Sequence, residues 1–189
     1  MSATPTDANA RGPDRRSSVV AGAVPDAETA ERGVRALQSA GFGRDTLGLA
    51  LHRRSEPGGL LGGVVGSLVG VEAETLVDAG PVVVGGMIAA VLRAGGTTGR
   101  AGGRIADVLE TLDLPETDVE HFAERFSAGD ALVTVRAGGR MREAVVLLTE
   151  NGADVGSRAE LATAESYGGT SDHDRRDATR PGRRRTDRM

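Results

Sequence analysis

Two segments of this chain carry the same pattern of residues. The first runs from Ser18 to Gly41 and the second from Ala131 to Gly152. Each opens with a short apolar run, continues with apolar residues at helical spacing, and ends at a glycine, which suits the left-handed position after a helix. The first helix also has Asp26 as a predicted N-cap. We therefore predict two β-α units, each with a helix whose apolar face needs a sheet to pack against.

A further strand is expected after each of these helices. Residues 46–52 alternate leucine with smaller or polar residues, which is the period of a half-buried strand. After the second helix only 153–155 is available, enough for a short edge strand. Two β-α-β halves predict an α+β fold, a ferredoxin-like sandwich in which helices cover one face of an antiparallel sheet.

Two more helices are predicted between the halves, over 105–112 and 115–127. Two helices joined by a tight turn are also found in DNA-binding proteins. The second helix, however, carries Glu116, Asp118, Glu120 and Glu124 against a single Arg125. This acidic helix would repel a phosphate backbone, so a DNA-reading role is disfavoured, and a surface for partner proteins is the weaker remaining use.

A glycine stripe is the most unusual feature of the insertion at 55–103. Gly58, Gly62, Gly66 and Gly70 recur every fourth residue, and a second uncharged run, 79–92, carries Gly85 and Gly86. As helices, both runs would measure about 21 Å, short of the roughly 30 Å of a bilayer core. We predict a helical hairpin packed glycine to glycine. Three placements stay open for it: against the domain, against a second chain, or dipped into one leaflet.

The two ends of the chain lack the apolar residues that a core requires. Residues 1–16 are predicted to be a disordered arm, and 157–189 a disordered tail rich in Arg and Asp. The ferredoxin-like domain is accordingly predicted to span 17–156.

Composition excludes several kinds of chemistry. The chain has no Cys and no Lys, so thiol catalysis, disulfides, Cys-ligated metals and lysine Schiff bases are excluded. Between residues 17 and 156 the chain has twelve Arg against nineteen acidic residues, and this acidic body argues against a dedicated nucleic-acid-binding domain. Residues 1–16 do not have the apolar stretch of a secretory signal, and no uncharged run is long enough for a spanning helix. We predict a cytoplasmic protein.

Few residues are candidates for a ligand site. His52 ends a predicted strand, and Arg100 and Arg104 lie in a glycine-rich stretch before a helix, where they could cradle a phosphate. A flexible return linker is the preferred interpretation of that stretch. His121 and Glu124 share a helix face and are interpreted as a solvated pair. We predict no metal, no cofactor and no catalytic residue.

Several short runs match the order of elements in one protein family. They are 40–42, 79–82, 112–116, 129–135 and 148–153, and they span roughly 18–156. In this order the chain resembles the bacterial general stress protein family, also described as low-temperature- or heat-induced proteins. The resemblance implies expression under stress and no established activity, cofactor or catalytic residue.

These observations lead to one hypothesis and one alternative. The hypothesis is a non-enzymatic, stress-associated protein that forms homo-oligomers through its glycine-zipper hairpin or makes shallow contact with the inner face of the membrane. The alternative is a small-ligand-binding or catalytic ferredoxin-like dimer that uses the sheet face and His52.

Overall fold

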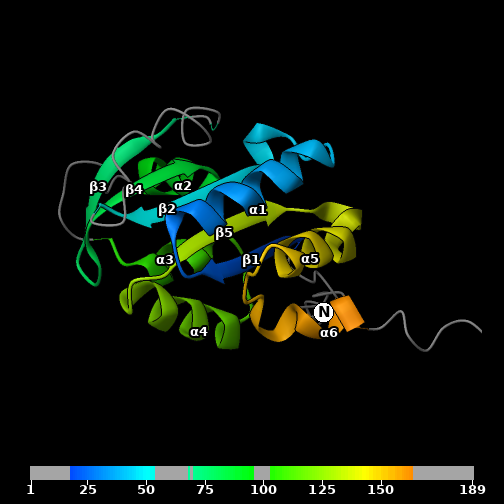
Figure 1. The fold of residues 1–189 in the computed structure, drawn as a ribbon. Coiled ribbons are helices and arrows are strands. Elements are labelled where there is room, and N and C mark those ends of the chain that lie inside the picture. The colour runs from blue at the N-terminus through cyan, green and yellow to red at the C-terminus, as the bar shows by residue number, and fades with distance from the viewer. Residues whose placement is uncertain (1–17, 54–67, 69, 96–102, 164–189) are drawn as a thin grey trace, which may run out of the picture.

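The computed structural model describes residues 18–53, 68, 70–95 and 103–163. Over these residues the chain is an α+β protein with a five-stranded antiparallel sheet (Figure 1). The predicted N-terminal arm, most of the predicted C-terminal tail and part of the glycine-rich insertion lie outside the described residues.

The strands of the sheet follow the order β1-β5-β2-β4-β3, and every neighbouring pair is antiparallel. Their bounds are Val19–Val24 for β1, Leu47–His52 for β2, Glu72–Leu76 for β3, Gly80–Gly86 for β4 and Ala131–Arg136 for β5. On the outer side of β1, Ala23 exchanges two backbone hydrogen bonds of 2.8 Å with Asp154. This bridge is the short edge pairing expected after α5.

Helices cover both faces of this sheet. Helices α1 and α5 pack on one face and lie in front of the strands in Figure 1, whereas α2, α3 and α4 pack on the other. Their bounds are Ala27–Ser39 for α1, Met87–Ala94 for α2, Ile105–Thr111 for α3, Glu116–Ser127 for α4 and Met141–Glu150 for α5. The short helix α6, Ala159–Thr163, packs against α5.

Local signals set the ends of α1 as predicted. Asp26 caps its first turn by accepting a hydrogen bond of 2.7 Å from the Thr29 N–H, which lowers the pKa of the Asp26 carboxyl. Gly41 follows the helix with a φ of +84°, a conformation that glycine adopts without strain. The apolar face of α1, with Ala30, Val34 and Leu37, is fully buried against the sheet.

The expectation of helices on one face is wrong. In β1, Val20 and Val24 join the core under α1 and α5, whereas Val19, Ala21 and Ala23 join the core on the other face. A strand that is apolar on both sides needs two helix layers to cover it. Helices α3 and α4 supply much of the second layer with the fully buried side chains of Ile105, Leu109, Phe122 and Phe126.

The predicted helix over 79–92 is wrong up to Gly86. Residues 80–86 form strand β4, which pairs with β2 and β3, and a helix begins only at Met87. The valines at 82–84 favour an extended chain, and Gly86 separates strand from helix with φ +63° and ψ −134°, which is open only to glycine. The insertion therefore extends the sheet by two strands, and these residues form no helical hairpin.

The predicted start of the disordered tail at Ser157 is also wrong. Residues Gly156–Arg158 form a turn of 3-10 helix, and α6 continues the ordered chain to Thr163. Leu161 packs against the core under α1 and α5. None of the helices in the described ranges is long and apolar enough to cross a membrane.

Candidate functional site

Strand β3 forms one edge of the sheet, so every second residue directs its backbone N–H and C=O groups away from β4. The Val77 N–H, just beyond the strand, donates a hydrogen bond of 3.1 Å to the Gly103 carbonyl, on the side away from β4. Because backbone groups alternate in direction along a strand, those of Thr75 and Ala73 face the same way. Pro81, opposite Thr75, fits this register because it has no N–H to offer β3.

Each edge of the sheet carries one isolated bridge among the described residues, but the two edges differ in burial. On the β1 side, both backbone groups of Ala23 are bonded to Asp154, and every residue of β1 is buried. On the β3 side, Gly103 is the one described residue that pairs with the outer edge, and it does so at Leu76. Ala73 and Thr75 are exposed. An edge of this kind is a template for pairing with another strand.

Glu72 and Glu74 give the β3 edge a negative charge, and one of them is paired. Arg93, on α2, places its Nη1 3.4 Å from Glu72 Oε1. The same guanidinium covers Gly70, where a Cβ would be too close to Arg93 Nη2. Gly70 also has a φ of +65° and lies in a bend, so its predicted role as a helix-packing glycine is wrong.

The other predicted zipper glycines are placed differently from the prediction. Gly85 lies in β4, where a Cβ would be 3.4 Å from Leu68 and from Val71. A Cβ on Gly86 would collide with the Leu47 carbonyl of β2. Both glycines therefore permit close approach within or onto the sheet and not between helices. The remaining stripe, Gly58, Gly62 and Gly66, lies outside the described residues.

A cavity of about 590 Å³ lies beside His52, as the alternative hypothesis required. The His52 ring stacks on the Phe126 ring at 4.4 Å between centroids, and its Nε2 is 2.6 Å from the Phe126 carbonyl oxygen. Since a carbonyl only accepts, Nε2 carries the proton. The cavity walls come from the end of β2, the β3–β4 turn and the α4–β5 connection, with His52, Arg53, Asp78, Ala79, Gly80, Pro81, Ser127 and Gly129.

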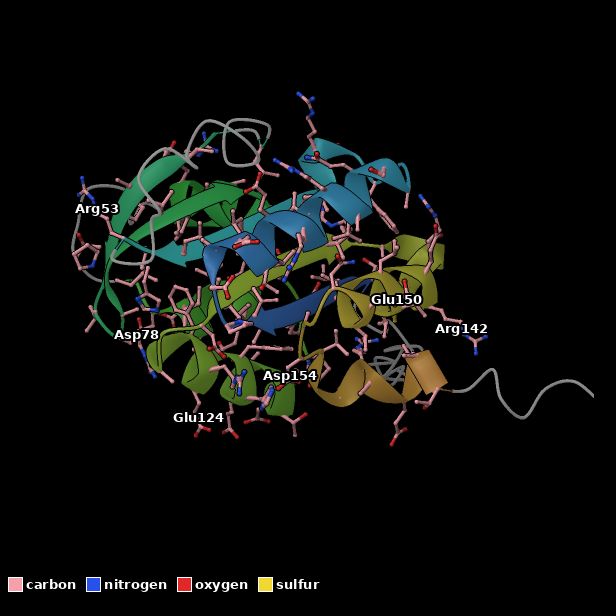
Figure 2. All side chains as sticks on the ribbon, in the orientation of Figure 1. Arg53, Asp78, Glu124, Arg142, Glu150 and Asp154 are labelled. Atoms are coloured by element: carbon pink, nitrogen blue, oxygen red, sulfur yellow. The ribbon has the colours of Figure 1, made fainter. Side chains whose placement is uncertain are left out.

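Three polar side chains line these walls, and the Asp78 carboxylate keeps one oxygen buried and closed to the cavity. Asp78 Oδ2 accepts a hydrogen bond of 3.2 Å from the Ile105 N–H, whereas the buried Asp78 Oδ1 has no partner among the described residues. Among the described residues, neither the Arg53 guanidinium nor the Ser127 hydroxyl has a hydrogen-bond or ion-pair partner. Figure 2 shows Arg53 and Asp78 at the same end of the sheet. Sequence reasoning found His52 and missed these three residues.

The predicted phosphate cradle gains no support from Arg104. This residue is exposed at the start of α3, and its own N–H binds Asp107 Oδ2 at 3.2 Å. The next N–H, that of Ile105, is already taken by Asp78. Arg104 does line a second cavity of about 450 Å³ between α2 and α3, with apolar walls that include Val91 and Val108. Arg100 lies outside the described residues.

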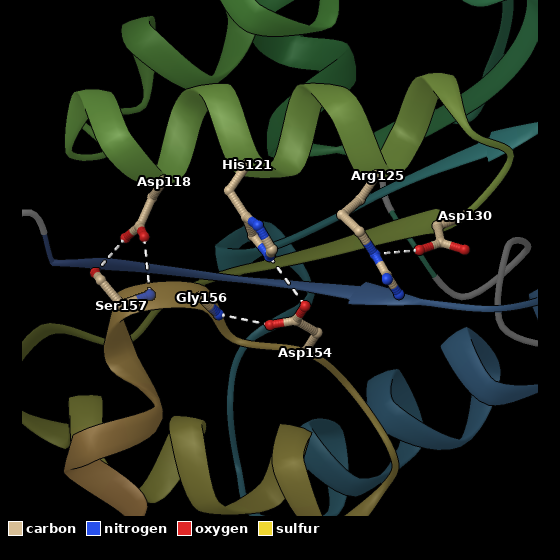
Figure 3. A network of polar contacts seen from close by, with 7 residues as sticks. All are labelled: Asp118, His121, Arg125, Asp130, Asp154, Gly156 and Ser157. Carbon is tan, nitrogen blue, oxygen red and sulfur yellow. Dashed lines mark hydrogen bonds and ion pairs between the residues drawn. The ribbon is translucent and has the colours of Figure 1, made fainter.

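A polar network fastens the chain after α5 to helix α4 (Figure 3). The carboxylate of Asp118, only 3% exposed, accepts hydrogen bonds from the Ser157 N–H at 2.9 Å and the Ser157 hydroxyl at 2.8 Å. Asp154 Oδ1 accepts from the Gly156 N–H at 3.0 Å. The network therefore orders residues 154–157 and holds the bridge between Asp154 and Ala23 of β1.

His121 belongs to this network and does not form the predicted pair with Glu124. Its Nε2 is 3.0 Å from Asp154 Oδ2. Burial alone would raise the pKa of Asp154, but hydrogen bonds from Gly156 and His121, with the charges of His121 and Arg125, outweigh it and lower that pKa. The contact joins residues far apart in sequence, so helical spacing did not reveal it.

Within the described part of the chain, no cluster of three or more His, Cys, Asp or Glu side chains is arranged to hold a metal ion. Comparison with protein-family models, curated proteins and solved structures finds no match to this chain. The resemblance to general stress proteins therefore stays a prediction that rests on the short runs given above.

Proposed function

We propose that this chain is a non-enzymatic protein that self-associates when the open edge of β3 pairs with the β3 edge of a second copy. One observation carries the proposal: β3 ends the sheet with the outward backbone groups of Ala73 and Thr75 unpaired by any described residue except Gly103 at one end. Pairing would join the two sheets into one and satisfy those groups.

An antiparallel pairing centred on Ala73 fits the edge. In this register Ala73 stands opposite Ala73 of the second copy, and Val71 stands opposite Thr75. Gly103 already lies beside Leu76, so the second copy's chain has to turn away from the edge before Val71, at Gly70. Val71, 36% exposed, would lose solvent contact on pairing. The proposed interface is therefore built from backbone bonds with a small apolar contribution.

Charge limits the strength of this pairing. In the same register Glu72 stands opposite Glu74 of the second copy, and like charges directly opposite each other destabilise a sheet. Arg93 beside Glu72 offsets part of the repulsion. Salt screens exposed charges of this kind, so the association should be stronger at higher ionic strength.

Two features support protein contact without catalysis. Met87, Ile88 and Leu92 of α2 are buried in the core, so this part of the second apolar run is not available to lipid. His52 and His121 are both engaged in contacts within the fold, with Phe126 and with Asp154. These contacts give both histidines a structural role within the fold.

The finer fold assignment and the stress role are parts of the same proposal. The order of the Asp154 bridge, β1, β5 and β2, with α1 and α5 on one face, supports a ferredoxin-like unit built from both β-α-β halves and extended by β4 and β3. A function under stress is supported by the family resemblance alone.

The test replaces Ala73, whose backbone N–H points away from β4 at the edge of the sheet. Ala73→Pro removes that N–H without removing a bond to β4, whereas the matched control Ala73→Val keeps it. We expect light scattering to show a dimer for the wild-type chain and Ala73→Val, and a monomer for Ala73→Pro. A monomeric wild type, or a dimer that survives Ala73→Pro, would contradict the proposal. Flotation of the wild type with liposomes would indicate membrane contact instead.

A further inference from the structure

The two acidic residues of β3 lie on the same face of the edge strand. Glu72 and Glu74 are two positions apart, so their side chains point to the same side of the sheet. Arg93 forms an ion pair with Glu72, whereas the half-buried Glu74 has no hydrogen-bond or ion-pair partner among the described residues. Within the described part of the chain, Glu74 is therefore the edge charge that is left unbalanced.

The other face of the edge carries small or apolar side chains. Ala73 and Thr75 are exposed on this face, and Val71 is 36% exposed just before the strand. Gly103 bridges the far end of β3, so 71–75 is the stretch of the outer edge that no described residue bridges. This stretch offers outward backbone groups at alternate positions, an apolar side and one unbalanced carboxylate.

We propose that this stretch binds an extended segment of another protein that places an arginine or a lysine opposite Glu74. The inference rests on the open edge that the proposed self-association also uses, and it names a partner that fits this edge better than a second copy does. A second copy places Glu72 opposite Glu74, a pair of like charges, whereas a basic side chain there forms a pair of opposite charges. Because Arg93 is already paired with Glu72, a neutral residue such as threonine fits opposite Glu72.

An antiparallel register gives the partner a defined pattern of side chains. The residue opposite Ala73 exchanges backbone hydrogen bonds with it, and the residues on either side of that position face Glu72 and Glu74. Apolar residues fit opposite the small or apolar side chains of Val71, Ala73 and Thr75. The peptide Ac-Val-Arg-Val-Thr-Val-NH2 has this pattern, because its arginine falls opposite Glu74 when its first valine lies opposite Thr75. We call it the arginine peptide.

The test is an NMR titration of the dilute full chain with the arginine peptide and two matched peptides. In the first, glutamate replaces the arginine. In the second, proline replaces the central valine and so removes the N–H that would bond to Ala73. We expect the arginine peptide to shift the amide signals of Ala73 and Thr75 at concentrations about fivefold lower than the glutamate peptide requires, and the proline peptide to bind most weakly. Equal potency of the arginine and glutamate peptides, or no shift with the arginine peptide, would overturn the inference.

The variant Glu74→Gln tests the charge that selects the peptide. It removes the unbalanced carboxylate and keeps the backbone of the edge, so the arginine and glutamate peptides should bind this variant with similar affinity. Glu150→Gln, at an exposed position on α5, is a matched control that should keep the preference for the arginine peptide. A preference that survives Glu74→Gln would assign the selecting charge to another residue and would overturn the inference.

Salt dependence and light scattering separate this inference from self-association. Binding of the arginine peptide should weaken as sodium chloride is added, because screening reduces an attraction, whereas the dimer should become stronger. A dimer that is lost in Ala73→Pro, together with no binding of the arginine peptide, would overturn this inference alone. A wild type that stays monomeric but binds the arginine peptide would overturn self-association alone.

Discussion

Thr134 lies in β5 with no exposed surface, and its hydroxyl oxygen has no hydrogen-bond partner in the part of the chain that the structure describes. Thr134→Val exchanges that hydroxyl for a methyl group of similar size. We expect the free energy of unfolding to rise by about 1 kcal/mol, because an unsatisfied buried polar atom is removed. Urea denaturation should show a higher midpoint with an unchanged slope. A lower midpoint would mean that the hydroxyl has a partner in solution.

Gly86 and Gly80 both have positive φ angles but differ in what surrounds them. A Cβ at Gly86 would collide with the Leu47 carbonyl, whereas a Cβ at Gly80 meets nothing within 4 Å. We expect Gly80→Ala to cost about 1 kcal/mol from backbone strain alone, and Gly86→Ala to cost at least about 3 kcal/mol. Urea denaturation of the two variants would measure this, and similar losses would contradict the assigned close approach of β4 to β2.

At the scale of elements, the joint between α4 and residues 154–157 should respond to acid. The pKa of Asp154 is lowered in the folded chain from an ordinary value of 3.8. Its contribution to stability is therefore complete above that value and is lost as the pH falls through the lower folded pKa. We expect the wild type to lose more unfolding free energy than Asp154→Asn between neutral pH and about pH 2. Equal losses would contradict a stabilising role for the ionised carboxylate.

Elements with a clear local period could be predicted from the sequence. The strands expected at 18–24, 46–52 and 131–136 and the helices at both repeats are confirmed, with small differences at their ends. The helix predicted for 79–86 was wrong because a short apolar segment can form either a buried strand or a buried helix, and its composition does not distinguish the two. The second helix layer could have been inferred from 19–24, where apolar residues follow one another without alternation.

Candidate sites were less predictable than helices and strands, because their residues lie far apart in the sequence and meet only in the folded chain. His52 was visible because it ends a strand of clear period. Asp78 and Ser127 join it only through the tertiary fold, and the same is true of the contact between His121 and Asp154. The open edge of β3 could not be predicted while 79–86 was assigned to a helix. These features depend on strand order, which local patterns do not contain.

At the scale of the whole molecule, self-association should strengthen with salt. Screening reduces the repulsion between Glu72 and Glu74 of the two copies, and backbone hydrogen bonds are little affected. We expect the dimer fraction measured by light scattering to rise between about 50 mM and 1 M sodium chloride, where the screening length shortens severalfold. Dissociation of the dimer by salt would instead indicate an interface held by opposite charges.

The most direct test of the proposed edge pairing is amide hydrogen exchange in β3 at several protein concentrations. The Glu74 N–H faces β4 and should be protected at every concentration, which makes it an internal reference. The Ala73 N–H faces outward, so its exchange should be fast in dilute solution and should slow as the dimer forms. Fast exchange of Ala73 at all concentrations, beside a protected Glu74, would contradict the account.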